Sequence, residues 1–218
     1  KKNAAIAKRF ISTHLEHYRT LKKVETFLKG QGIVYKKMLR GHQQDFSEYD
    51  LIITVGGDGT FLEGASKVTT QLILGINSDP QWSVGRLCFA NSSNFAGIII
   101  NILTNKAKIR PLNRMKIFLA KSKKSALAIN DILICHRNPA TMSRYFLKFQ
   151  GKGEEQRSSG VWVATAAGST GAIHSAGGKV LDENSKNLQF VVREPYFGKI
   201  KKMKQRTAVF NQQTPLKI

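Results

Sequence analysis

Apolar residues near the start of the chain recur at steps of three and four, which is the spacing of one face of an α-helix. The pattern runs from Leu15 to Leu28, and Gly30 and Gly32 are expected to end the helix, because glycine readily adopts the backbone conformation that stops one. A short strand is predicted directly afterwards, at residues 33–35.

Two later segments, residues 51–55 and 72–76, are apolar, and the first is rich in β-branched residues. Such runs are typical of strands that are buried on both faces of a parallel sheet. Apolar residues at helical spacing follow these strands, at residues 61–68 and 95–103. This alternation predicts a Rossmann-like α/β domain with a doubly wound parallel sheet, whose ligand lies at the carboxyl ends of the strands.

After Pro111 the pattern changes to short strand-like segments that are separated by polar or glycine-containing turns. These segments are residues 115–120, 126–135, 145–149, 161–165 and 188–192. We therefore predict an α/β domain over residues 1–107 and a mainly β domain over residues 108–218, with the ligand in a cleft between them.

The composition adds one unusual feature, a formal net charge of +21 from 35 Lys and Arg against 14 Asp and Glu. Such a charge attracts phosphate-bearing ligands, and it would equally attract nucleic acid. Aromatic residues are not interleaved with the basic ones, as a stacking platform for bases requires. Small nucleotides are therefore the expected partners, and specific nucleic-acid binding is not expected. A local basic cluster comprises Lys199, Lys201, Lys202 and Lys204.

Other sequence features indicate an intracellular protein, in a bacterial cytoplasm or in an organelle such as the mitochondrion or peroxisome. No apolar run approaches the roughly 20 residues of a membrane span, and no export signal is visible. Cys88 and Cys135 stand far apart and are expected to be buried, reduced thiols. His14 and His17 share a helix face but lack a third ligand, so no metal site made by the protein is predicted.

The turn Gly-Gly-Asp-Gly-Thr at residues 56–60 joins a predicted buried strand to a predicted helix. Its glycines allow close backbone approach, and Gly56, Gly57, Gly59 and Thr60 are the expected phosphate-binding residues. A turn that only bound phosphates would avoid a carboxylate, so Asp58 indicates a hydroxyl group or a metal ion beside them. Phosphoryl transfer is the predicted chemistry, although a purely structural turn is the alternative. Thr60 either contacts the ligand or caps the helix.

The turn resembles the hallmark of the NAD kinases, and diacylglycerol and sphingosine kinases share it. Two further motifs resemble the NAD kinases specifically: Ala-Ile-Asn-Asp at residues 128–131, and Thr-Ala-Ala-Gly-Ser-Thr-Gly-Ala-Ile-His-Ser-Ala-Gly-Gly at residues 165–178. Three shorter segments, residues 75–80, 158–160 and 192–195, resemble the branch that contains mitochondrial NAD kinases and plant NADH kinase. The resemblance covers about residues 15–197.

The resemblance implies an enzyme that uses ATP and a divalent metal such as Mg²⁺ to phosphorylate the adenosine 2′-hydroxyl of NAD⁺ or NADH, producing NADP⁺ or NADPH. It implies that Asp58 accepts the proton of that hydroxyl, with Gly59 beside it. The dinucleotide pocket that it implies also includes Asn130, Asp131, Thr170, Gly171, Ala172 and Ser175. It further implies a homo-oligomer, a dimer or a tetramer.

Three features depart from the family pattern. Ser159 stands where an Asp is common, and Ala172 stands near a position that is usually aromatic. Residues 197–218 do not align with the closing strands of the β domain, so some of these strands are expected to be absent.

Two other functions remain open. A lipid kinase would need an exposed apolar or amphipathic surface, and no such surface is clear in the sequence. A catalytically silent relative that binds nucleotides or nucleic acid would fit the charge and Ser159. The preference between NAD⁺ and NADH, and between ATP and polyphosphate as donor, is also open.

Overall fold

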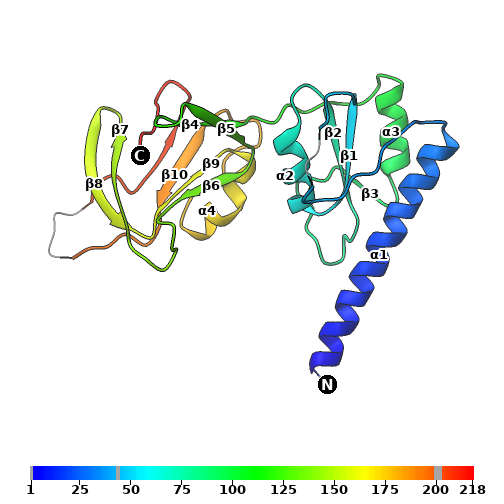
Figure 1. Cartoon of the computed structure of the whole chain (residues 1–218), viewed down its shortest axis with the longest axis horizontal. Coiled ribbons are helices and arrows are strands. Elements are labelled where there is room, and N and C mark those ends of the chain that lie inside the picture. The colour runs from blue at the N-terminus through cyan, green and yellow to red at the C-terminus, as the bar shows by residue number, and fades with distance from the viewer. Residues whose placement is uncertain (1, 43–44, 199–202) are drawn as a thin grey trace. The chain divides into compact units, whose positions relative to one another are not determined.

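The computed structural model describes residues 2–42, 45–198 and 203–218. Three members of the basic cluster, Lys199, Lys201 and Lys202, lie outside these residues. The chain forms two compact units, residues 1–109 and residues 110–218, and each has a hydrophobic core of its own (Figure 1).

The sheet of the first unit is parallel, in the order β1 (Leu51–Gly56), β2 (Leu72–Asn77) and β3 (Ala90–Asn91). β1 and β2 confirm the two predicted strands. They pair along their whole length, from Leu51 opposite Leu72 to Gly56 opposite Asn77. Because the strands are parallel, their carboxyl ends meet at one edge of the sheet, where the glycine-rich turn begins.

Helices cover both faces of this sheet, which confirms the doubly wound α/β arrangement (Figure 1). The helices are α1 (Lys2–Gly30), α2 (Asp58–Lys67) and α3 (Phe95–Leu103). α2 packs so closely on β1 that a Cβ at Gly64 would lie 2.8 Å from Cγ2 of Thr54. α1 and α3 share a core cluster with β2 and β3, which consists of Val24, Leu28, Leu74, Ile76, Ala90, Phe95 and Ile99.

The chain after α1 is extended but belongs to no strand, so the strand predicted at residues 33–35 is wrong. Gly32 has a φ of +67°, and the N–H of Ile33 donates to the carbonyl oxygen of Leu28 at 2.9 Å. The chain therefore turns back against the end of the helix. Ile33 and Tyr35 then pack on the core of the unit, which explains their apolar character without a neighbouring strand.

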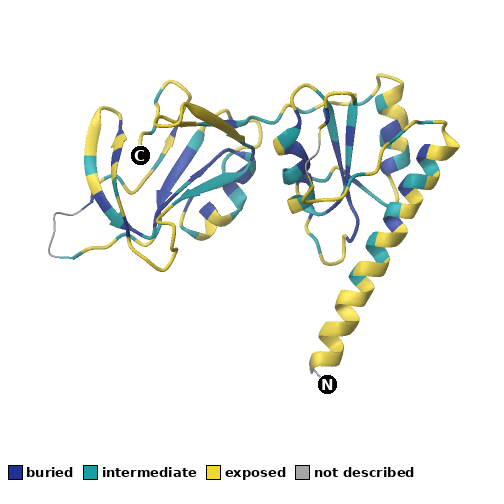
Figure 2. Cartoon of the chain, viewed as in Figure 1, coloured by how far each residue is buried: buried dark blue, intermediate teal, exposed yellow. Residues whose placement is uncertain are grey.

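The first half of α1 is mostly exposed (Figure 2), and its exposed residues include a series of large apolar side chains. These side chains are 48% to 70% exposed, and they belong to Ile6, Phe10, Ile11, Leu15 and Tyr18. The sequence did not make this apolar surface clear, and the structure reveals it. Among the helices that the structure describes, none is both long enough and apolar enough to cross a membrane.

The second unit is mainly β, as predicted. Its largest sheet has the antiparallel strand order β11 (Thr207–Phe210), β10 (Leu188–Val192), β9 (Val161–Ala164) and β6 (Asp131–Ile134). Two hairpins accompany it, β4 (Met115–Leu119) with β5 (Lys124–Ala128), and β7 (Ser143–Phe149) with β8 (Lys152–Ser158). A 3₁₀ turn, η1 (Ala167–Thr170), leads into the short helix α4 (Ala172–Ser175).

The strand predicted over residues 126–135 divides into β5 and β6, and the break falls at Ile129 and Asn130. The two parts do not pair with each other, since β5 belongs to a hairpin and β6 to the larger sheet. The strands β3, β8 and β11 were not predicted.

Three phenylalanine rings form the centre of the second core. The ring of Phe149 lies 5.3 Å from that of Phe190 and 5.5 Å from that of Phe210, between ring centroids, in edge-to-face arrangements. Phe190 comes from β10, in the middle of the sheet, and is fully buried.

Replacement of this central ring tests the core. Phe190→Ala should lower the free energy of unfolding by about 3–5 kcal/mol, because it removes a fully buried aromatic side chain and leaves a cavity. Urea unfolding measures the change. Phe118→Ala is the matched control, because Phe118 is 64% exposed on β4 and its loss should cost about 0.5 kcal/mol or less. Equal effects of the two changes would contradict the position of the core.

Candidate functional site

The glycine-rich turn links β1 directly to α2. Gly57 is the N-cap residue of α2, and no side chain caps the helix. The first N–H groups of an uncapped helix lack partners within the helix and can bind a phosphate. Gly56 has a φ of +157°, and a Cβ there would lie 2.4 Å from Oγ1 of Thr60, so only glycine fits. Thr60 lies within the helix and not at its cap, so the capping role considered for it is wrong.

Asp58 opens α2, and backbone N–H groups hold both of its carboxylate oxygens. Oδ1 accepts a hydrogen bond from the N–H of Leu87 at 2.8 Å, and Oδ2 accepts one from the N–H of Arg86 at 3.1 Å. The residue is partly buried. These two bonds fix the position and the rotation of the carboxylate, and they tie it to a loop that the sequence did not assign to the site.

This loop, residues 78–88, follows β2 and is held in shape by the buried side chain of Asn77. The Asn77 amide donates to the carbonyl oxygen of Ser83 at 2.9 Å and accepts from the N–H of Asp79 at 3.2 Å. Gly85 has a φ of +60°, and a Cβ there would lie 2.3 Å from Nδ2 of Asn77. Ser83 also lies against the glycine-rich turn, since its Oγ is 2.6 Å from the position of a Cβ at Gly57.

The helix α1 contacts the start of the same loop. His17 Nδ1 lies 3.0 Å from Oγ of Ser78, and the hydroxyl of Thr20 donates to the carbonyl oxygen of Ser78 at 3.3 Å. Arg9 places its guanidinium 4.2 Å from the ring centroid of Trp82. Burial, followed by the charges of neighbouring basic groups, lowers the pKa of His17. His17 therefore supports the loop, a role that the sequence did not indicate.

The two cysteines differ in exposure, and both are free thiols. Cys88 is partly buried, and burial together with the charge of Asp58 raises its pKa to about 11. Its Sγ lies 3.7 Å from the carbonyl oxygen of Gly56. Cys135 is exposed, so the expectation of two buried thiols is wrong for this residue. No group of three or more potential metal-binding His, Cys, Asp or Glu side chains occurs within the described part of the chain.

In the second unit the motif at residues 128–131 packs against the motif at residues 165–178. The carbonyl oxygen of Asn130 accepts hydrogen bonds from the N–H of Thr165 at 3.0 Å and from its hydroxyl at 3.3 Å. A Cβ at Gly168 would lie 2.1 Å from the same carbonyl oxygen, so the approach requires glycine. The break between β5 and β6 therefore follows from this contact, which turns the backbone at Asn130 toward η1.

Asn130 and Asp131 lie beside the start of α4. The Asn130 amide donates to Oδ1 of Asp131 at 3.2 Å, and a Cβ at Gly171 would lie 3.2 Å from Oδ2 of Asp131. Thr170 and Gly171 are partly exposed, whereas Ala172 and Ser175 are exposed on α4. The structure thus brings Asn130, Asp131 and Gly171 together, with Thr170 and Ala172 adjacent in the chain. That these residues and Asp58 line one common cleft stays a prediction.

The pKa of Asp131 is raised, and burial is the main cause. The Asn130 amide and the N–H groups of Ala172 and Ile173 act in the opposite direction, since they favour the charged form. Oδ2 is buried and has no hydrogen-bond partner of good geometry among the described residues. Folding therefore makes the charged form of the Asp131 carboxylate less stable relative to its protonated form.

Comparisons with known proteins identify the relatives of this chain. No family model matches it. It is 35% identical to a probable NADH kinase of Oryza sativa subsp. japonica over 202 residues, which cover 82% of this chain and 62% of that protein. It is 33% identical to the NADH kinase of Arabidopsis thaliana over 203 residues, which cover 82% of this chain and 64% of that protein. This chain is homologous to NAD kinases and NADH kinases. It spans less than two thirds of the length of these plant relatives.

A solved structure confirms the NAD kinase fold. The crystal structure of an NAD kinase from Archaeoglobus fulgidus in complex with ATP superposes with a TM-score of 0.68 at 26% identity, and covers 90% of this chain and 74% of that one. The resemblance to NAD kinases and to plant NADH kinase is therefore confirmed. The roles assigned to individual residues stay predictions.

One departure from the NAD kinase pattern has a structural counterpart. The hydroxyl of Ser159 donates to Oε2 of Glu194 at 2.5 Å, so a carboxylate lies next to Ser159, the residue that stands where the family commonly has Asp. The donated bond and the charge of Arg193 lower the pKa of Glu194. β9 begins next to this pair and ends opposite Asp131, so the two acidic groups lie at opposite ends of the strand.

The buried carboxylate of Asp131 predicts a pH-dependent stability difference. Because its folded pKa lies above the ordinary 3.8, the folded state binds this proton more tightly than the unfolded state, and stability falls as pH rises from 3.8 to the folded pKa. Asp131→Asn cannot ionise, so it should be more stable than the wild type at neutral pH. This gain in stability over the wild type should vanish below pH 3.8. Thermal unfolding of both proteins at a series of pH values measures it.

Asp182→Asn is the control for this measurement, because Asp182 is exposed and accepts the N–H of Asn184 at 2.9 Å, a bond that an amide oxygen can also accept. It should show no gain at neutral pH. A loss of stability in Asp131→Asn at neutral pH would contradict the direction of the pKa shift.

Proposed function

We propose that this chain is the nucleotide-binding and catalytic region of an NAD(H) kinase. The reaction transfers a phosphoryl group from ATP, or from polyphosphate as the alternative donor, to the adenosine 2′-hydroxyl of NAD⁺ or NADH, and yields NADP⁺ or NADPH. The observation that carries the proposal is the Asp58 carboxylate, fixed on both oxygens in a glycine-rich turn after a buried parallel strand. The similarity to NADH kinases and to an NAD kinase solved with ATP supports it.

Asp58 would orient the 2′-hydroxyl and accept its proton. Each carboxylate oxygen has more than one lone pair, so oxygens that accept from Arg86 and Leu87 can still accept from a sugar hydroxyl. As the hydroxyl oxygen bonds to the γ-phosphorus, the bond to the leaving diphosphate breaks and the proton passes to Asp58. Phosphoryl transfer proceeds through a loose transition state, so positioning matters more than basicity.

The turn at residues 56–60 would hold the phosphates of the donor. Gly56, Gly57 and Gly59 leave its backbone open, and the uncapped start of α2 offers N–H groups to phosphate oxygens, beside the hydroxyl of Thr60. A divalent cation that accompanies ATP would neutralise charge on the transferred group.

The second unit would bind the dinucleotide. Asn130 and Asp131 offer hydrogen-bond donors and acceptors side by side, which suits ribose hydroxyls and polar base groups. Gly171 leaves space next to them. The remaining members of the proposed pocket are Thr170, Ala172 and Ser175.

The alternatives are less well supported. The apolar face of α1 would suit a lipid kinase, but the relatives reported above are NAD and NADH kinases. A catalytically silent relative would not need the fixed carboxylate of Asp58. A homo-oligomer, dimer or tetramer, and a location in a bacterial cytoplasm or an organelle stay part of the proposal.

Turnover of both dinucleotides with both donors, coupled to an NADP-specific dehydrogenase, tests the function. Asp58→Asn should lower kcat by about 10²–10⁴, the usual contribution of a positioned general base, with little change in dinucleotide affinity. Asp50→Asn is the control, because Asp50 is exposed before β1 and should leave kcat unchanged.

Two results would contradict the proposal. One is a folded wild-type protein with no turnover of either dinucleotide in the presence of Mg²⁺. The other is an Asp58→Asn variant that keeps the wild-type kcat.

A further inference from the structure

Asp79 has an unusual environment for a charged side chain. It is 6% exposed, and it is the only charged residue that is buried among the residues the structure describes. Its Oδ2 atom is fully buried and has no hydrogen-bond partner there, and no salt bridge from a described residue reaches its carboxylate. Buried charges in proteins are paired or bind metal ions, because an isolated ionised carboxylate is very costly to bury.

A structural role in the turn does not explain this carboxylate. Aspartates that begin turns normally accept backbone N–H groups two residues later, and Asp45 and Asp182 do so, each at 2.9 Å. Asp79 differs, because the N–H groups of Trp82 and Ser83 donate to its backbone carbonyl oxygen, at 3.2 and 2.9 Å. The backbone hydrogen bonds that close this turn therefore form without the Asp79 carboxylate.

The position of Asp79 relates it to the phosphate-binding turn. It lies two residues after Asn77, and Asn77 pairs with Gly56, the first residue of that turn. Ser83, which closes the turn that Asp79 begins, lies against Gly57. Asp79 thus lies at the sheet edge where the triphosphate is proposed to bind.

One carboxylate is also sufficient for the expected cation. Mg²⁺ keeps several water molecules and is usually held by one or two carboxylates together with the phosphates of the substrate. Asp58 already binds two backbone N–H groups through its carboxylate oxygens, whereas the Oδ2 atom of Asp79 has no such partner. The residues present therefore fit a divalent cation.

We propose that Asp79 is a protein ligand of the divalent cation that accompanies the phosphate donor, so that Asp58 serves the sugar hydroxyl and Asp79 serves the metal. The proposal rests on the proposed function, and it replaces the expectation that the protein contributes no metal ligand. The pocket described next plays no part in it.

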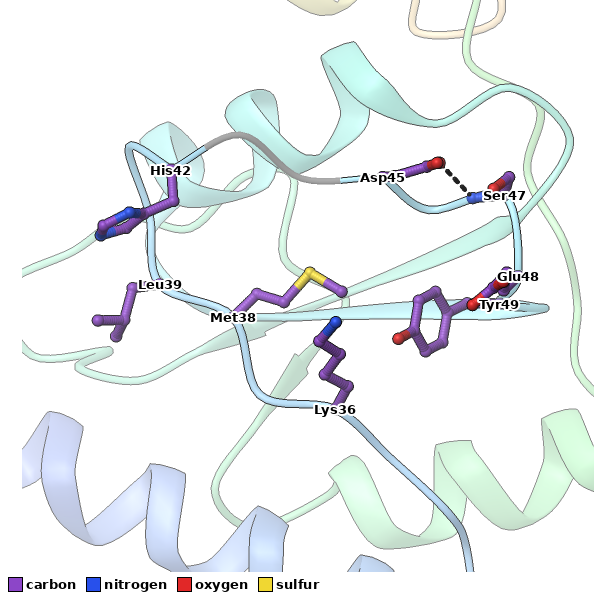
Figure 3. Close-up of a pocket in the computed structure, with 8 residues that line it drawn as sticks. All are labelled: Lys36, Met38, Leu39, His42, Asp45, Ser47, Glu48 and Tyr49. Carbon is purple, nitrogen blue, oxygen red and sulfur yellow. Dashed lines mark hydrogen bonds between the residues drawn. The ribbon is translucent and has the colours of Figure 1, made fainter.

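The pocket near the start of β1 does not contain this site. It has a volume of about 460 Å³ and lies on the segment before the strand (Figure 3). Neither Asp79 nor any of the predicted site residues lines it. The lining residues are Lys36, Met38, Leu39, His42, Asp45, Ser47, Glu48 and Tyr49.

Binding of Mn²⁺, measured by electron paramagnetic resonance with and without ADP, tests the proposal without turnover. Asp79→Asn keeps the shape of the side chain and removes its charge, so it should weaken Mn²⁺ binding by at least about tenfold, the loss that even outer-shell partners can cause. Without metal, its thermal midpoint should lie above that of the wild type, because the buried charge is gone. Asp50→Asn, which changes an exposed aspartate in the same unit, should match the wild type in both measurements.

A measurement on the wild type alone covers the case in which Asp79→Asn does not fold. Mn²⁺ in the presence of ADP should broaden the amide NMR signals of Ser78 and Ser83 and leave that of Phe190, in the other unit's core, unaffected. Broadening that spares residues 78–83 would overturn the proposal.

The remaining outcomes separate this proposal from the proposed function. Wild-type Mn²⁺ affinity in Asp79→Asn, with kinase turnover intact, would overturn the metal role alone. Absence of Mn²⁺ binding by the folded wild type, with ADP present, would also overturn it, whatever the stability of Asp79→Asn. Metal binding at residues 78–83 without turnover of either dinucleotide would support the metal role and contradict the kinase.

Discussion

The two backbone N–H groups that hold the Asp58 carboxylate make the interaction on which the proposed function of the first unit depends. A carboxylate at the start of a helix is favoured by the helix dipole, but a single favourable field does not fix its rotation. Hydrogen bonds from Arg86 and Leu87 to separate oxygens do fix it. Positioning is the main requirement of the proposed phosphoryl transfer, so a side chain that is already oriented would lose little conformational entropy when the sugar hydroxyl binds.

The orientation of Asp58 therefore depends on the rigidity of the loop of residues 78–88, which supplies both N–H groups. An exposed loop would normally be mobile, and a mobile donor could not orient a carboxylate. Asn77 prevents this, because its buried amide bonds both Asp79 and Ser83, and Gly85 permits the close approach that this needs. The contacts of α1 with Ser78 and Trp82 then connect the loop to the helical layer. The shape of this candidate site is thus maintained largely by residues that have no role in the proposed reaction.

The sequence predicted the parts of the fold whose local pattern and tertiary role agree. β1, β2 and α3 were found because burial on both sides or at helical spacing leaves a clear apolar pattern. β8 was missed because its residues, Lys-Gly-Glu-Glu-Gln-Arg-Ser, are polar and its pairing with β7 supplies the order. In the site, glycines and acids could be located by type and spacing, whereas the hydrogen bonds from Arg86 and Leu87 could not, because they join positions 28 and 29 residues apart through backbone atoms.

Three aspartates of this chain illustrate three ways in which a protein can accommodate a partly or fully buried carboxylate. Asp58 is satisfied by backbone N–H groups, so its charge is compatible with folding. Asp131 has a raised pKa, so part of the burial cost is met by a tighter hold on its proton. Within the described part of the chain Asp79 has neither a hydrogen-bond donor at Oδ2 nor a salt bridge, and it is the most deeply buried of the three. A cation, as proposed above, would satisfy a charge at this position, and the adjoining glycine-rich turn is where the proposed reaction requires one.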